Sequence, residues 1–160
     1  MKVLVDSSIL IALAKIGELD FLREHYGRIY ITEEIKSEVT DGNRPENIRL
    51  KRIVGNWIEV VQDPENDDYS GLNGLDQGDK SILNLAADNE DVLLLLDETE
   101  ARAVAKAEGL FYTGTLGLIV YLNEIEVISK DKAMKIVKKL ANSDFRMTVE
   151  LYDWALDKIG

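Results

Sequence analysis

The chain has 160 residues, of which 46% are hydrophobic and 31% charged, a balance typical of a folded protein rather than a disordered one. It contains no cysteine and one histidine, which excludes disulfides, zinc–thiolate sites, thiol nucleophiles and histidine-rich metal sites. With 30 acidic and 19 basic residues the net charge is −11. This charge argues against a nucleic-acid-binding scaffold, but not against a nucleic-acid enzyme whose acids surround metal ions.

The length favours one domain over residues 1–160. The stretch 63–79 is polar and turn-rich, but no shift in composition makes it a domain boundary. The N-terminus lacks the basic region and long apolar run of a signal peptide, and the longest apolar stretch, LGLIVYL, is far too short to span a membrane. We therefore expect a cytoplasmic protein.

Strand and helix patterns alternate along the chain. We expect strands at residues 2–5, 28–31, 57–62, 92–96 and 110–114. Helices are expected at 8–26 (one or two), 32–40, 46–55, 77–89, 98–109 (closed by Gly109), 115–124, 131–142 and 148–159. The strand VLLLL is apolar throughout, which is typical of a parallel strand covered on both faces. The alternation predicts a three-layer α/β/α fold with a central, mostly parallel sheet of four to five strands.

Two carboxylates directly follow predicted strands. Asp6 ends the run KVLV, and Asp97 ends VLLLL. If both strands are central and parallel, both side chains emerge at the edge of the sheet where ligands bind in such folds. The alternative is that each is a helix N-cap, and Glu100 stands where a capping box with Asp97 would need it.

Two further acids are placed by helical phase near an apolar stripe. Glu38 follows Ile35 by three residues, and Asp79 precedes Ile82 by three. The alternatives are a half-solvated helix edge for Glu38 and a helix-dipole partner for Asp79. An inward acid is costly unless it is paired or bound to metal, and no matching set of inward Lys or Arg accompanies these four. Together they indicate a bound cation.

Several motifs resemble the PIN-domain ribonuclease family: VDSSILIAL, IKSEV, LDQGDKSILNLA and LLLLDETEARAVAKAEGL. The later stretches FYTGTLGLIVYL and SDFRMTVELYDWAL resemble a prokaryotic branch related to VapC-type toxins. The resemblance implies a parallel sheet flanked by helices, an acidic Mg²⁺ or Mn²⁺ site, cleavage of single-stranded RNA, a homodimer and often a small antitoxin partner. Asp6, Glu38, Asp79 and Asp97 stand at the positions of the family's acidic quartet.

The sequence departs from the family pattern after Asp97. Many relatives have a further acid or polar ligand there, whereas this chain reads Glu98-Thr99-Glu100, and which of these, if any, contacts the metal stays open. Ser8 matches a small hydroxyl residue common at its place, where it either orients the Asp6 carboxylate or is only a first-turn helix residue.

These residues suit hydrolysis of a phosphodiester. Cations held by carboxylates can activate water, neutralise the phosphoryl oxygens and stabilise the leaving alkoxide, without any histidine or cysteine. Together with the family resemblance, this chemistry predicts an endoribonuclease that depends on Mg²⁺ or Mn²⁺, and the resemblance implies the toxin of a toxin–antitoxin pair as its biological role. Asp6 and Asp97 are the expected main ligands, and Asp79 and Glu38 complete the site or hold a second ion.

Two basic patches are candidates for contacts to RNA: Lys51-Arg52, and the helix with Lys132, Lys135, Lys138 and Lys139. Either patch can equally be a solvated face. Tyr69 and Tyr112 are candidates for stacking on bases, with ordinary packing as the alternative. The apolar run Leu116, Leu118, Ile119, Val120 and Leu122 exceeds what one inward face needs, so we expect part of it at a homodimer interface unless the helix is wholly buried.

Three other functions compete with the nuclease. A phosphatase of the haloacid-dehalogenase type needs a second Asp where Ser8 stands, and a receiver domain needs paired acids where Ser7 and Ser8 stand. Both are disfavoured. The remaining alternative is a non-catalytic PIN-like interaction module with a vacant metal site.

Overall fold

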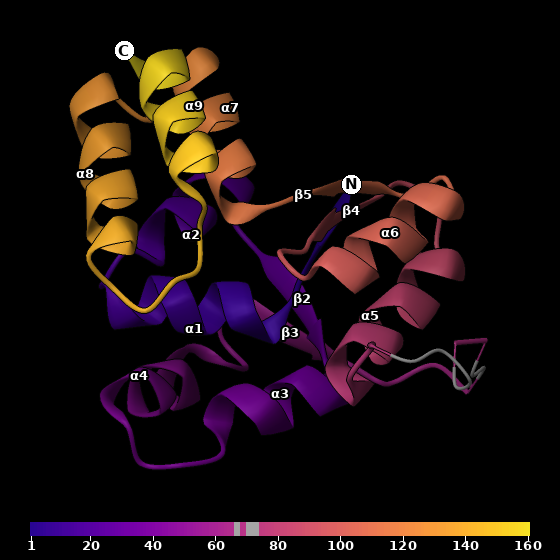
Figure 1. The fold of residues 1–160 in the computed structure, drawn as a ribbon. Coiled ribbons are helices and arrows are strands. Elements are labelled where there is room, and N and C mark those ends of the chain that lie inside the picture. The colour runs from indigo at the N-terminus through magenta and orange to yellow at the C-terminus, as the bar shows by residue number, and fades with distance from the viewer. Residues whose placement is uncertain (66–67, 70–73) are drawn as a thin grey trace.

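Five strands form one wholly parallel sheet in the described residues of the computed structural model, which are 1–65, 68–69 and 74–160 (Figure 1). Their order across the sheet is β3-β2-β1-β4-β5. The bounds are β1 Lys2–Val5, β2 Ile29–Thr32, β3 Ile58–Val61, β4 Val92–Leu95 and β5 Phe111–Thr113. Each strand lies within one residue of its predicted bounds.

Helices flank the sheet and connect its strands. Within the described residues they are α1 Ser7–Lys15, α2 Asp20–Tyr26, α3 Glu33–Thr40, α4 Pro45–Ile53, α5 Gln77–Ala87, α6 Thr99–Ala107, α7 Thr115–Glu124, α8 Lys130–Ala141 and α9 Val149–Ile159. α5 packs against β1, β2 and β4 with α6 beside it, whereas α1 packs against α3 and α4. The predicted three-layer α/β/α fold is confirmed.

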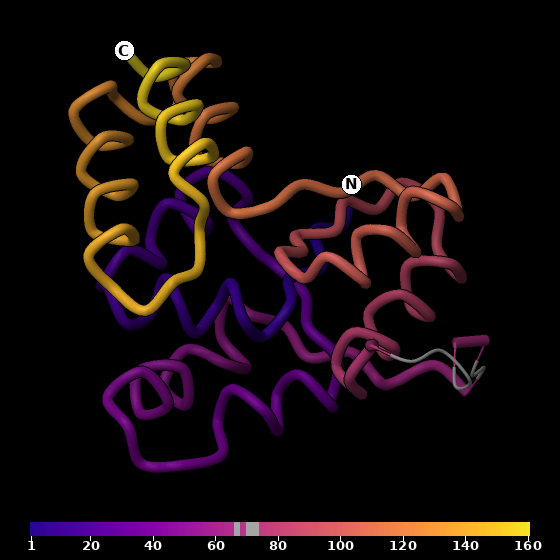
Figure 2. Tube along the Cα trace, in the orientation of Figure 1, coloured from indigo at the N-terminus to yellow at the C-terminus, as the bar shows by residue number. Residues whose placement is uncertain are grey.

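The strand order positions the site. From β1 the chain moves outward through β2 to β3, then returns through α5 to β4 on the other side of β1, a path that can be followed in Figure 2. β1 and β4 end level with each other, because Val5 pairs with Leu95. In a parallel sheet, the crevice at such a reversal of strand order is where ligands bind.

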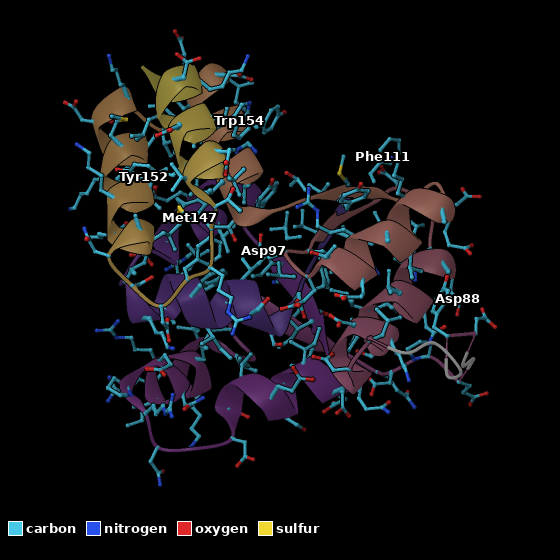
Figure 3. The ribbon with its side chains drawn as sticks, in the orientation of Figure 1. Asp88, Asp97, Phe111, Met147, Tyr152 and Trp154 are labelled. Carbon is cyan, nitrogen blue, oxygen red and sulfur yellow. The ribbon has the colours of Figure 1, made fainter. Side chains whose placement is uncertain are left out.

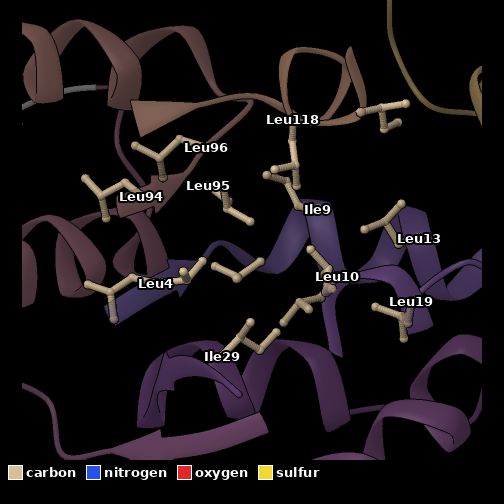
Figure 4. Packing of buried hydrophobic residues seen from close by; sticks show 14 of the residues in the cluster. Leu4, Ile9, Leu10, Leu13, Leu19, Ile29, Leu94, Leu95, Leu96 and Leu118 are labelled. Carbon is tan, nitrogen blue, oxygen red and sulfur yellow. The ribbon is translucent and has the colours of Figure 1, made fainter. Parts of the chain in front are cut away.

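A single apolar cluster surrounds β1 and β4 (Figure 4). Leu4 and Leu94 are neighbours in the ladder and both are buried, while Ile9, Leu10 and Leu13 bury one face of α1. Covering helices on both sides explain why these strands read as continuous apolar runs. The rigid core fixes the strand ends from which the acidic side chains emerge.

Helices α7, α8 and α9 pack together beside the sheet (Figure 1). Their mutual packing buries the apolar residues of α7 inside the chain, namely Leu116, Leu118, Ile119, Val120 and Leu122. The expectation that part of this set forms a dimer interface is therefore wrong. The remaining apolar face of α7 is covered by α8 and α9. Local sequence does not show that these helices pack against α7.

Other sequence-based expectations concern single segments. Among the described residues, no helix is both long enough and apolar enough to traverse a lipid bilayer. Residues 66–67 and 70–73 of the predicted loop at 63–79 lie outside the described residues. Tyr69 is buried, so the packing alternative holds for this side chain and base stacking does not.

Candidate active site

Asp6 lies at the carboxyl edge of the sheet, one residue beyond β1. Its backbone N–H donates to the carbonyl of Leu95 at 3.1 Å, which continues the β1–β4 ladder to the site. The side chain is only 2% exposed, so the carboxylate is almost wholly removed from water. Such burial is costly unless neighbouring groups compensate the charge.

Two serines hold the Asp6 carboxylate. Oδ1 accepts from the Ser7 backbone N–H at 2.8 Å, which makes Asp6 the N-cap of α1, and Oδ2 accepts from Ser8 Oγ at 3.0 Å. The Ser7 hydroxyl lies 3.5 Å from Asp6 Oδ1 and donates to Glu38 Oε2 at 2.6 Å. The capping role is therefore real, and the same turn links Asp6 to a second acid on α3.

Glu38 reaches this turn from α3 and is half-buried. Its other neighbour is Gly78 at the start of α5, whose backbone approaches the carboxylate closely. A Cβ placed on Gly78 would overlap Glu38 Oε1, so only glycine permits this approach. The half-solvated alternative for Glu38 is thus partly right, but its carboxylate faces the site.

Asp79 lies in the first turn of α5 and is 2% exposed. It shares a capping box with Asp76: the Asp79 N–H donates to Asp76 Oδ1 at 2.8 Å, and the Asp76 N–H donates to Asp79 Oδ2 at 3.3 Å. The remaining oxygen, Asp79 Oδ1, is buried and has no hydrogen-bond partner in the described residues. A buried, unpaired carboxylate oxygen is rare in a folded protein and requires an explanation.

The buried acids resist ionisation. Burial raises the pKa of Asp6 to about 7, against the opposing bonds from Ser8 and Ser7 and with the help of the Asp76 and Glu38 charges. Burial likewise raises the pKa of Asp79 to about 7, and the charges of Asp6, Asp76 and Glu98 add to it. The pKa of Glu38 is also raised, chiefly by burial. These carboxylates, at the start of α1, on α3 and at the start of α5, therefore interact electrostatically with one another.

Asp97 is held differently from the other three predicted acids. Its Oδ1 accepts from the Thr115 backbone N–H at 2.9 Å, and its Oδ2 accepts from Thr115 Oγ1 at 2.6 Å. It therefore binds the first residue of α7. The interpretation of Asp97 as the N-cap of α6 with a Glu100 capping box is wrong, because Glu98 is the N-cap and makes no side-chain capping bond.

A hollow of about 740 Å³ opens beside these residues. It is lined by Ser8, Ile11, Ala12, Lys15, Asp97, Glu98, Thr99, Glu100, Asp144, Phe145 and Arg146. Figure 3 shows Asp97 near the centre of the molecule, between α1, α6 and the connection that carries Met147. The candidates Thr99 and Glu100 are exposed in this wall, so they reach the solvent side of the site rather than the buried acids.

The chemistry of these residues fits a hard divalent cation. Hydroxyls, backbone amides and other carboxylates surround Asp6 and Asp79, and within the described chain neither forms an ion pair with Lys or Arg. Oxygen donors of this kind suit Mg²⁺ and Mn²⁺. Across residues 1–65, 68–69 and 74–160, however, no three acidic or histidine side chains are close enough to form a complete ion-binding group.

Four further residues shape the site without standing out in the sequence. Ser7 links Asp6 to Glu38, Asp76 caps α5, Gly78 admits Glu38, and Thr115 holds Asp97. Asp76 carried a readable signal, since it stands three residues before Asp79 at a helix start. The contact of Thr115 with Asp97 depends on β4 and β5 being neighbours, which local sequence does not specify.

The molecule is thus a three-layer α/β/α protein with buried acids at the carboxyl edge of a five-stranded parallel sheet. A family model described as a PIN domain matches residues 2–160, and the chain belongs to the PIN-domain family, whose fold is of the nuclease type. Searches of curated proteins and of solved structures find no match.

Proposed function

We propose that the protein is an endoribonuclease that depends on Mg²⁺ or Mn²⁺ and hydrolyses phosphodiesters of single-stranded RNA. The observation that supports this most strongly is the pair Asp6 and Asp79. Both carboxylates are buried without a basic partner in the described residues, and Asp79 Oδ1 has no hydrogen bond. A divalent cation would satisfy that oxygen and remove the repulsion between the acids.

Each of the four predicted acids has a proposed role at the metal site. Asp6, Asp79 and Glu38 would hold the ion by moving closer together around it, since no three acidic side chains of the described residues form a complete ion-binding group on their own. Ser7 and Ser8 would keep the Asp6 carboxylate oriented. The two bonds from Thr115 fix Asp97, and each of its oxygens retains a lone pair for a ligand. A bound ion supplies charge neutralisation at the phosphate and lowers the pKa of an attacking water.

Cleavage of a labelled single-stranded RNA, measured with Mn²⁺ and with EDTA, tests the proposal. We expect cleavage only with the metal, and a loss of at least about 100-fold for Asp6→Asn and Asp79→Asn, whose amides cannot replace a charged ligand. Asp88→Asn is the matched control, because Asp88 is exposed at the opposite end of α5. Equal rates for wild type and Asp6→Asn would mean that the assignment of the site is wrong, and no cleavage by wild type with metal would favour a non-catalytic PIN-like interaction module.

The partners proposed for the chain rest on the family resemblance. A second copy would form a homodimer, and a small antitoxin protein would block the site if the nuclease is a toxin. Because the apolar residues of α7 are buried, a dimer would use exposed side chains such as Phe111, Tyr121 and Ile125. Sedimentation at micromolar concentration tests the dimer, and a monomer there would exclude it.

A further inference from the structure

The basic patches expected to bind RNA are partly engaged elsewhere. Lys132 and Lys139 both form ion pairs with Glu18, at 2.5 and 2.7 Å. Lys51 donates to the carbonyl of Gly42, and Arg52 borders a separate hollow beside Trp57. A strand of RNA that reaches the acids of a chain with net charge −11 needs cations closer to the site.

Two adjoining hollows meet at Asp97 and form what we call the Arg146 groove. The first is the 740 Å³ hollow beside Ser8 and Asp97, and the second holds about 220 Å³. Both share Asp97, Phe145 and Arg146. The second continues between α6, α7 and α9 and is lined further by Arg102, Thr113, Gly114, Leu116, Gly117, Leu151 and Trp154.

The second hollow has a net positive charge, whereas the molecule as a whole has a net negative charge. Arg102 and Arg146 line it against one carboxylate, Asp97, whereas the whole chain is strongly acidic. Neither guanidinium forms an ion pair with any described residue. Arg102 lies over the ring of Tyr112, 5.4 Å from its centroid, and this contact orients it without neutralising it. Two exposed guanidinium groups are therefore available for phosphates.

Aromatic side chains lie beside these cations. Phe145 is half-buried in both hollows, and Trp154 on α9 is 41% exposed in the second (Figure 3). An aromatic face of this kind gives a base a stacking surface that is tolerant of sequence. Guanidinium groups next to exposed rings in one groove are the combination that binds single-stranded nucleic acid.

We propose that the Arg146 groove binds single-stranded RNA and leads it to the acids, with Arg146 and Arg102 on phosphates and Trp154 stacked on a base. This assignment rests on the proposed nuclease function, since it makes the groove the path of that enzyme's substrate. A duplex offers no unstacked base to Trp154, so the groove should prefer single strands over double strands.

Binding is measured separately from cleavage, so that the two proposals can fail independently. The parent is Asp6→Asn, and the probe is a fluorescein-labelled oligouridylate, followed by anisotropy at low salt. We expect Arg146→Gln to weaken binding several-fold and to reduce the slope of log affinity against log salt by roughly 0.7. Trp154→Ala should weaken binding roughly 5- to 100-fold, and Trp154→Phe should restore most of it. Arg23→Gln, at an exposed position of α2, is the matched control for loss of one guanidinium.

Intrinsic fluorescence gives a second readout, because Trp57 is buried and Trp154 is the exposed tryptophan. RNA should quench the emission, and the quenching should persist in Trp57→Phe. The groove assignment is overturned if the parent binds no oligouridylate, or if Arg146→Gln weakens binding no more than Arg23→Gln does. Normal groove binding with no cleavage by wild type would instead overturn the nuclease proposal and leave the groove standing.

Discussion

Asp6 and Asp79 are carboxylic acids in surroundings that disfavour their charge. Each is 2% exposed, and each has a pKa raised to about 7, first by burial and then by neighbouring carboxylates. Without a bound cation, a substantial part of each population is therefore protonated at neutral pH. Natural cores seldom retain such groups, so their persistence here is explained best by a ligand that binds the charged form.

Replacing Asp79 by Asn should therefore stabilise the metal-free protein. The amide keeps an oxygen for the Asp76 N–H while removing a buried charge. We expect the free energy of unfolding at pH 8, in EDTA, to rise by about 1–3 kcal/mol. Urea denaturation measures this difference, and Asp88→Asn should leave it within about 0.5 kcal/mol of wild type. A loss of stability would mean that the Asp79 charge serves the capping box rather than a ligand.

Gly78 offers a second test at the scale of one residue. A Cβ at this position overlaps Glu38 Oε1, so Gly78→Ala should push the carboxylate out of the site. Because the overlapping atom is the far end of a flexible side chain, Glu38 can move aside at little cost. We therefore expect little change in the free energy of unfolding, measured by urea denaturation, but at least ~10-fold slower cleavage.

The shorter acid in Gly78→Ala/Glu38→Asp provides the matched rescue. If the overlap is the cause, the double variant should cleave RNA faster than the two single effects on the cleavage rate, taken together, predict. Additive effects of the two substitutions would show that Gly78 and Glu38 do not constrain each other.

At the scale of elements, the site is built from the N-terminal ends of helices. Asp6 caps α1, Asp79 belongs to the capping box of α5, and Asp97 accepts from the first residue of α7. Sequence could predict the first two, because a carboxylate between a strand and a helix has a local signature. It could not predict that Asp97 serves α7 rather than α6, because that choice depends on the position of β5 beside β4.

The same limit explains the errors for the C-terminal helices. Periodicity located α7, α8 and α9, and Gly109 with φ 70° follows α6 as predicted. Nothing local showed that α8 and α9 would cover the second apolar face of α7. The lysines of α8 were similarly ambiguous, because Glu18, their partner, precedes α8 by more than a hundred residues.

Glu18 joins two distant elements and makes a testable contribution to stability. It is 5% exposed and accepts from Lys132 and Lys139, which attaches α8 to the connection between α1 and α2. Against the effect of burial, these two lysines lower the pKa of Glu18 below its usual 4.5. We expect Glu18→Gln to lower the free energy of unfolding at pH 7 by about 1–3 kcal/mol.

The effect of pH separates the ion pairs from simple packing. A lowered pKa contributes stability above the unfolded value of 4.5, and that contribution is lost as the pH falls through the folded pKa. The difference between wild type and Glu18→Gln in urea denaturation should therefore shrink in acid. Lys135→Gln, at an exposed position of the same helix, should show little effect at any pH. A difference that is independent of pH would assign the loss to packing.

At the scale of the whole molecule, the acids make stability depend on pH and metal together. The folded state raises the pKa values of Asp6 and Asp79 to about 7, above the usual 3.8 of an aspartic acid, so it binds more protons than the unfolded state between these values. Metal-free stability should therefore fall as the pH rises through this window. A cation that binds only the folded, ionised site reverses the trend, because its binding displaces those protons.

We therefore expect the melting temperature in EDTA to be higher at pH 6 than at pH 8, and millimolar Mn²⁺ to raise it more at pH 8 than at pH 6. At about 100 times Kd the ion contributes ~2.7 kcal/mol, a shift of several degrees for a chain of this size. Sodium chloride at matched ionic strength controls for screening of the −11 net charge. Asp6→Asn should lose most of the Mn²⁺ response and part of the pH dependence, while Asp88→Asn keeps both. A wild type that melts at the same temperature with and without Mn²⁺ at pH 8 would show that the acids hold no ion, and Asp6 would then be only the cap of α1.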